Sequence, residues 1–158
     1  MKKFLLKTGE LVCIVLLGVF IAVVCLQDSV SSQPFEAVEK TVTEVAVTEG
    51  LTSRDSLEVK KKLSLENDAY TDFICFSSDS VMDVRELMLF KVQDSNAVRT
   101  VSGKIKEYVE EKAKIFEGYA PEESSMLSAH VLIGKKGYVL FYVGEDKEAV
   151  ASAFSKSL

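Results

Sequence analysis

Residues 11–26 form an uncharged and almost wholly apolar run, LVCIVLLGVFIAVVCL. Twelve of these sixteen residues are Leu, Ile, Val or Phe, and together they favour transfer into a bilayer by about 4–7 kcal/mol. A helix from Thr8 to Gln27 would be about 30 Å long, which is the thickness of the hydrocarbon layer. We therefore predict a transmembrane helix at Leu11–Leu26, because helices buried in soluble proteins rarely stay apolar on every face.

The charges that flank this segment predict its orientation. Lys2, Lys3 and Lys7 precede it, and Asp28 follows it. The positive-inside rule then places the N-terminus in the cytoplasm and the remainder outside a cell membrane that is crossed once. The predicted parts are a cytoplasmic stub at 1–10, an anchor at 11–27, a linker at 28–34 and an extracytoplasmic domain at 35–158.

Two alternatives to a simple uncleaved anchor stay open, and so does the pairing of two anchors. The segment Ser29–Ser31 is a weak match to a signal-peptidase site, which needs small residues before the cut. Cys25 lies where a lipoprotein signal has its lipidated cysteine, although Val24 before it is larger than the small residue required there. Gly18 and Ala22 form a small-xxx-small pair that could bring two helices together. We favour the uncleaved anchor.

Charge and cysteine content exclude several functions for the rest of the chain. Beyond the first ten residues there are 16 basic and 23 acidic residues, a net charge of −7, which is the wrong sign for binding nucleic acid. Cys75 is the one cysteine of the external domain and His130 is the one histidine of the chain. A disulfide within the domain and a Cys/His metal site are therefore excluded. We predict no metal, no cofactor and no nucleic-acid partner, and a buried, inert Cys75 thiol.

Apolar spacing predicts an α+β fold for the external domain. Predicted helices are Phe35–Val47 after Pro34, a short helix at Leu57–Leu63, a long helix from Asp94 or Ser95 to Gly118, a short one from Pro121 to near Ser128, and a last helix capped by Asp146. Predicted strands are Tyr70–Ser77, Arg85–Gln93, His130–Ile133 and Tyr138–Val143. The last two strands flank Gly134–Gly137, which is typical of a hairpin loop. The order α-(ββα)-(ββα), behind an N-terminal transmembrane helix, predicts an antiparallel sheet with helices packed on it; the strand order stays open.

We find no catalytic constellation in this sequence. His130 has no partner motif of the kind that activates a Ser or Cys nucleophile. Neighbouring carboxylates such as Glu110 and Glu111 do not face each other on a helix. We therefore assign no catalytic residue.

Four residues are candidates for binding. Glu86 and Lys91 are charges in a strongly apolar strand, and residues five apart in a strand point to opposite faces, so they do not pair with each other. Tyr119 follows the end of the long helix, where its ring could border a groove. Tyr138 begins the last strand. The alternative interpretation is that these four are ordinary edge charges and packed tyrosines.

Three segments resemble one bacterial family. They are Met82–Glu86 running into Phe90–Val92, then Phe116–Glu122, then Gly137–Phe141 followed by a helix with Ala153 and Phe154. In this order they make the chain, from about Leu57 to Leu158, similar to the family called domain of unknown function 4358. The resemblance implies a small membrane-anchored or lipoprotein-like protein with the same fold, and implies no activity. One departure lies at Tyr108–Glu111, where family members often carry Arg followed by Gln.

The expected function is that of a membrane-tethered, extracytoplasmic binding or interaction domain of the bacterial cell envelope. Its expected partners are the membrane, through Leu11–Leu26, and an envelope protein, the wall polymer or a second copy of the chain. The alternative is an envelope enzyme, for example a hydrolase, with an unrecognised active site. An enzyme would need a deep pocket with converging polar groups, and a pocket lined by Glu86 or Tyr119 would favour it.

Overall fold

The computed structural model describes residues 12–21, 30–66 and 68–158. Residues 12–21 are helical. Among the described helices, none combines the length and the apolar character needed to cross a membrane. The predicted span Leu11–Leu26 extends beyond the described residues at both ends. The stub at 1–10, Ala22 and Cys25 lie outside the described residues. The transmembrane helix and its alternatives therefore stay predictions.

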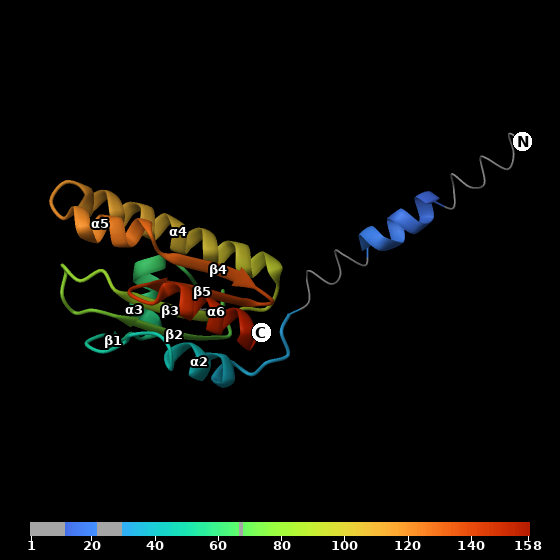
Figure 1. Ribbon diagram of the computed structural model, residues 1–158, viewed down its shortest axis with the longest axis horizontal. Coiled ribbons are helices and arrows are strands. Elements are labelled where there is room, and N and C mark those ends of the chain that lie inside the picture. The colour runs from blue at the N-terminus through green and yellow to red at the C-terminus, as the bar shows by residue number, and fades with distance from the viewer. Residues whose placement is uncertain (1–11, 22–29, 67) are drawn as a thin grey trace, which may run out of the picture.

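The remaining elements form an α+β domain, as the sequence predicted. They are α2 (Phe35–Thr43), β1 (Thr52–Ser53), α3 (Ser56–Leu63), β2 (Asp72–Ser77), β3 (Glu86–Lys91), α4 (Ser95–Glu117), α5 (Pro121–Ser128), β4 (Val131–Lys135), β5 (Tyr138–Val143) and α6 (Lys147–Ser157). The five strands form one antiparallel sheet in the order β1-β2-β3-β5-β4 (Figure 1). Strand β1 was not predicted, because it is two exposed polar residues long and leaves no apolar pattern.

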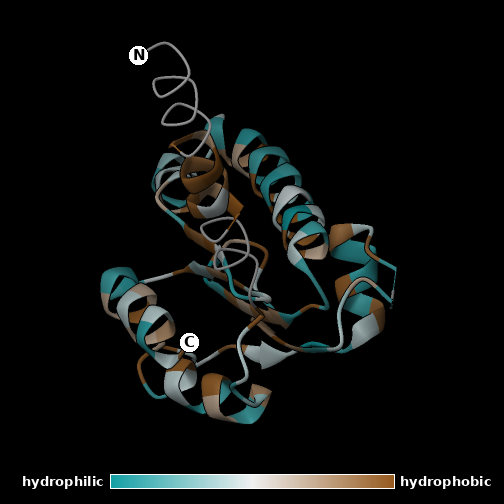
Figure 2. Ribbon diagram, turned by 90° about the vertical axis from the view of Figure 1, so that its right-hand side faces the viewer, coloured by the Kyte–Doolittle hydropathy of each residue, from teal (hydrophilic) through white to brown (hydrophobic). Residues whose placement is uncertain are grey.

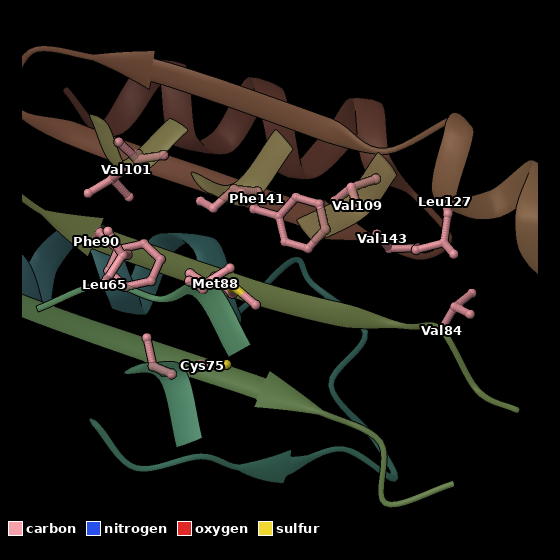
Figure 3. Close-up of a cluster of buried hydrophobic side chains, with 14 of the residues drawn as sticks. Leu65, Cys75, Val84, Met88, Phe90, Val101, Val109, Leu127, Phe141 and Val143 are labelled. Carbon is pink, nitrogen blue, oxygen red and sulfur yellow. The ribbon is translucent and has the colours of Figure 1, made fainter. Parts of the chain in front are cut away.

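Helices cover both faces of the sheet, and each face has its own core. Helices α3, α4 and α5 pack on one face, and α2 and α6 pack on the other. Figure 2 shows mostly hydrophobic strands between helices whose outer sides are hydrophilic. Both β3 and β5 are almost wholly buried, since alternate residues enter the two cores. Figure 3 shows the core beneath α4, where Met88 and Phe90 of β3 and Phe141 of β5 lie close to Val101 and Val109.

Two helix ends differ from the predictions. The first helix ends at Thr43 rather than Val47, at a run of β-branched residues that disfavour a helix. Asp94 caps α4 as predicted, since its side chain accepts a hydrogen bond from the Ala97 amide at 2.8 Å. Asp146 precedes α6 but has a left-handed φ of 53° and makes no capping hydrogen bond with its side chain. Asp146 thus occupies the predicted N-cap position, but its side chain does not cap the helix.

The predicted hairpin is present, with a tighter turn than expected. Lys136 and Gly137 form the turn, with φ values of 50° and 78°, as in the two-residue turns that suit the twist of a hairpin. Gly134 lies within β4 instead of the loop, under α4. A Cβ at Gly134 would lie 2.5 Å from Val98 Cγ1, so glycine here permits the close approach of helix and strand.

The chain enters the domain beside this turn. The Ser31 amide donates to the Lys136 carbonyl at 2.7 Å, and the Tyr138 hydroxyl donates to the Gln33 carbonyl at 2.8 Å. Part of the predicted linker at 28–34 is therefore hydrogen-bonded to the sheet; residues 28 and 29 lie outside the described residues. In the register of β3 with β5, Lys91 pairs with Tyr138 at this end, while Glu86 lies at the opposite end.

Candidate functional site

Glu86 is a fully buried carboxylate at the start of β3, with 0% of its surface exposed. It lies on the α4 face of the sheet, the same face as Met88 and Phe90. A carboxylate buried beside an apolar core is costly unless charged or hydrogen-bonding groups compensate it. The neighbours of Glu86 therefore determine what this position does.

Three side chains from two helices compensate Glu86. Lys62 of α3 forms an ion pair with Oε1. The Tyr108 hydroxyl of α4 donates to Oε2 at 2.8 Å, and the Lys112 ammonium, one turn further, lies 3.6 Å from Oε2. Lys112 also donates to the Tyr108 hydroxyl at 3.1 Å. We call Glu86, Lys62, Tyr108 and Lys112 the Glu86 cluster.

The Glu86 cluster forms one wall of an open hollow of about 290 Å³. Lys62, Tyr108 and Lys112 line it from the helices, and residues 77–81 with Asp83 line it from the end of β2 and the following loop. A smaller hollow of about 80 Å³ also borders Lys62 and Tyr108, between α3 and α4. Glu86 is not among the lining residues, so on the helix side a ligand would meet Lys62, Tyr108 and Lys112, and on the loop side Asp79 and Asp83.

The two aspartates of the hollow are already paired with arginines. Asp79 accepts from the Thr52 hydroxyl at 2.8 Å and from Arg54 Nη2 at 2.6 Å, and these hydrogen bonds lower its pKa. Asp83 accepts from Arg85 Nη2 at 2.6 Å and from its Nε, which likewise lowers its pKa. Each aspartate therefore has an arginine as its partner, which comes from the segment between β1 and α3 for Asp79 and from its own loop for Asp83.

Positive charge exceeds negative charge within the Glu86 cluster. Lys62 and Lys112 share one carboxylate. Burial lowers the pKa of Lys112, and repulsion from Lys62 adds to this effect while the attraction of Glu86 opposes it. Burial therefore makes the charged form of Lys112 less favourable than it would be in water, and a negative charge nearby favours it.

Burial also suppresses the reactivity of the two other ionisable groups here. The pKa of Tyr108 is raised by burial and then by the charge of Glu86. Burial raises the pKa of Cys75 to about 12, and the Glu86 carboxylate adds to the shift. Only a thiolate is an effective nucleophile, so Cys75 is inert at neutral pH. Its predicted burial is confirmed.

The four predicted binding residues do not form one site. Glu86 is at one end of β3, and Lys91 and Tyr138 are at the other. The Lys91 ammonium lies 5.7 Å from the centre of the Tyr138 ring and 3.5 Å from the Gln33 carbonyl oxygen, so both residues contact the segment before α2. Tyr119 follows α4 and is 59% exposed, with its ring 5.4 Å from that of Phe116.

Sequence reasoning missed Lys62, Tyr108 and Lys112. Lys62 stands in a run of three lysines, Lys60–Lys62, which is typical of a solvated helix face, and Tyr108 lies among the apolar positions of the long helix. A signal was present: Lys112 continues the buried stripe of Val101, Ile105 and Tyr108 at helical spacing. A lysine on that stripe requires an acidic partner, and Glu86 in its apolar strand was the unpaired candidate.

The arrangement suits binding better than acid–base or metal chemistry. Acid–base catalysis by carboxyl groups typically uses two of them with different pKa values, one as the acid and one as the base. The Glu86 cluster contains one carboxylate, held by two ammonium groups. In the parts of the chain that the structure describes, no three His, Cys, Asp or Glu side chains lie together as metal ligands would.

Comparison with known proteins identifies a family and no function. No significant match was found among functionally curated proteins, and none among solved structures. The family model described as domain of unknown function (DUF4358) matches residues 43–144. The match begins and ends earlier than the resemblance predicted from the sequence, which ran from about Leu57 to Leu158. The matched segment contains the whole Glu86 cluster and ends before α6. Because this match covers well over half of the sequence, the chain belongs to the DUF4358 family.

Proposed function

We propose that this chain is a membrane-tethered binding domain on the outer side of a bacterial cell membrane, and that it binds its partner at the hollow beside the Glu86 cluster. The observation that carries the proposal is the position of this hollow. It opens where Lys62 and Lys112 meet at the Glu86 end of the sheet, opposite the end at which the chain enters the domain.

Exposed apolar side chains support the membrane tether. The large apolar residues of the helix at 12–21 are between 52% and 66% exposed. A continuous apolar surface of this kind is unfavourable in water and is stabilised by a lipid bilayer or another apolar surface. The lysines that precede the segment favour an outward-facing domain.

The place where the incoming chain is attached to the sheet supports a hollow that faces away from the membrane. Ser31 holds the incoming chain at Lys136 of the β4–β5 turn, so the end of the sheet with Lys91 is the end nearer the tether. The hollow at the Glu86 end then faces away from the membrane. Tethering confines it to the envelope and raises its effective concentration toward partners there.

The rival interpretation, an envelope enzyme, gains no comparable support. The hollow is open, and neither Glu86 nor Tyr119 is among the residues that line it. Catalytic pockets usually enclose most of a substrate. Binding is therefore the function that this geometry favours.

Site-specific photo-crosslinking in intact cells tests the proposal. Val81 lines the hollow and is 86% exposed, so a photoreactive amino acid introduced there should capture the bound partner. Lys40 on α2 is also exposed but lies on the opposite face of the sheet, and it provides the matched control. We expect a discrete adduct from Val81 and none from Lys40. No adduct from Val81, or the same products from both positions, would contradict the proposal.

A further inference from the structure

The lysine side of the hollow carries one positive charge in excess. Lys62 and Lys112 contribute two ammonium groups and Glu86 one carboxylate. Asp79 and Asp83, which also line the hollow, are each paired with an arginine at 2.6 Å. Arg54 also pairs with Glu58 at 3.5 Å, so among the described residues the local excess of positive charge is confined to Lys62 and Lys112 on their side of the hollow.

Both lysine side chains line the hollow and are partly exposed. The side chains of Lys62 and Lys112 are 21% and 22% exposed, whereas Glu86 is fully buried. Their ammonium groups lie 5.7 Å and 5.4 Å from the centre of the same Tyr108 ring. A ligand entering the hollow would therefore meet two neighbouring cations that α3 and α4 already hold in place.

The acidity of the whole domain does not prevent a small anion from binding here. At physiological ionic strength, exposed charges more than about 8 Å apart are largely screened. A long polyanion would experience the net negative surface of the domain, but a single charged group is governed by the nearest lysines.

We infer that the hollow binds a carboxylate group of the partner between Lys62 and Lys112. This inference rests on the proposed function, because it names the chemical class of ligand for the same site. A carboxylate carries the single negative charge that the excess positive charge requires. Arginine forks bind phosphate through two hydrogen bonds, whereas lysine binds it as a point charge. The two arginines near the hollow, Arg54 and Arg85, are already bound to Asp79 and Asp83, so a phosphate would have only the two lysines.

The Lys112 environment supports this assignment. Its pKa is lowered by burial despite the nearby Glu86, which means that a second carboxylate would stabilise its charged form. The hydroxyl groups of Ser77, Ser78 and Ser80 lie in the wall of the hollow. Ser77 already accepts from Arg54 and Lys62. Ser80 accepts from the Met82 amide at 3.3 Å, and its hydroxyl hydrogen is the donor for a bound carboxylate.

Nuclear magnetic resonance titration with acetate tests this inference on the full-length chain in micelles of an uncharged detergent. Ionic strength is kept constant with chloride, and inorganic phosphate is titrated in a parallel series. We expect saturable shifts of the amide signals of residues 78–83 with acetate, and weaker shifts with phosphate. No saturable shift with acetate, or tighter binding of phosphate, would overturn the carboxylate assignment.

A variant in which the Glu86 cluster carries no charge tests whether the two lysines bind the acetate. Lys62→Gln, Lys112→Gln and Glu86→Gln together leave no buried charge unpaired, and a dispersed amide spectrum would verify that the protein still folds. Acetate should bind at least tenfold more weakly to this variant. Lys106→Gln, on the exposed side of α4, changes the net charge by the same amount and should bind acetate as the wild type does. Equal binding by all three proteins would overturn the inference.

The two proposals fail in different ways. If acetate does not bind but the crosslink from Val81 persists, the binding function stands and the carboxylate assignment falls. If the crosslink from Val81 is also absent, the proposed function itself falls.

Discussion

At the scale of single residues, Glu86 determines how α3 and α4 meet the sheet. Its two oxygens are paired with Lys62 and Tyr108, from different helices, and Lys112 lies beside them. Such a buried pair contributes little net stability compared with apolar packing, but removing one partner is strongly destabilising. The carboxylate therefore fixes the relative positions of the groups that line the hollow.

Replacing Glu86 by Gln should destabilise the domain. The substitution keeps the shape of the side chain but leaves Lys62 and Lys112 close together without a counter-charge, at a cost of about 2–4 kcal/mol in the free energy of unfolding, because both lysines retain some access to water. Urea titration followed by circular dichroism measures this change. Glu110→Gln removes an exposed carboxylate and should change the free energy by no more than about 0.5 kcal/mol. Equal effects of the two substitutions would contradict the importance of the Glu86 cluster.

Cys75 should resist alkylation while the protein is folded. The thiol is 1% exposed and has a pKa of about 12, so almost no thiolate is present at pH 8. Mass spectrometry of the peptide that contains Cys75, after iodoacetamide treatment, should show modification only in urea. Rapid modification of the folded protein would mean that β2 opens readily or that the thiol is exposed.

At the scale of secondary-structure elements, the β4–β5 hairpin supports both the sheet and the incoming chain. Gly137 has a φ of 78°, and a Cβ at this position would lie 2.6 Å from Val30 Cγ1. The turn therefore depends on glycine for two independent reasons, its backbone conformation and the space that the incoming chain occupies.

Two identical substitutions should have opposite effects. Gly137→Ala should lower the free energy of unfolding by about 1–3 kcal/mol, because alanine is strained at positive φ and would contact Val30. Gly103→Ala should raise it by up to about 1 kcal/mol, because alanine favours a helix over glycine. Gly103 is exposed within α4, and nothing lies within 4 Å of an added Cβ. Urea titration of both variants makes the comparison; destabilisation by Gly103→Ala, or no cost for Gly137→Ala, would contradict the described turn and helix.

Most elements could be predicted from the sequence, but most of the candidate site could not. Alternating or continuous apolar residues predicted the four longer strands, and helical spacing predicted α4 closely. The strand order and the partners of Glu86 depend on how distant elements pack: Lys62 is 24 residues from Glu86 and Tyr108 is 22. The spacing of residues along a single helix or strand does not reveal which distant elements pack together. The family resemblance, which depends on several short motifs in order, was confirmed.

At the scale of the whole molecule, the two faces of the sheet differ in their relation to the family. Helices α3, α4 and α5, which cover the face with the Glu86 cluster, lie within the matched residues 43–144. Helix α6 lies outside them, and α2 is matched only at its last residue. We therefore expect the hollow, rather than the α2–α6 face, to carry the function of this family.

The orientation of the domain in the cell envelope is the claim on which the proposed function depends. Labelling Val81→Cys with a membrane-impermeant maleimide in intact cells tests it directly, because this position borders the hollow and is highly exposed. Peptide-resolved mass spectrometry separates this label from any on the native cysteines. The account predicts full labelling before the cells are permeabilised, in protein recovered with the membrane fraction. Labelling only after permeabilisation, or recovery of the uncleaved protein from the cytosolic fraction without detergent, would contradict it.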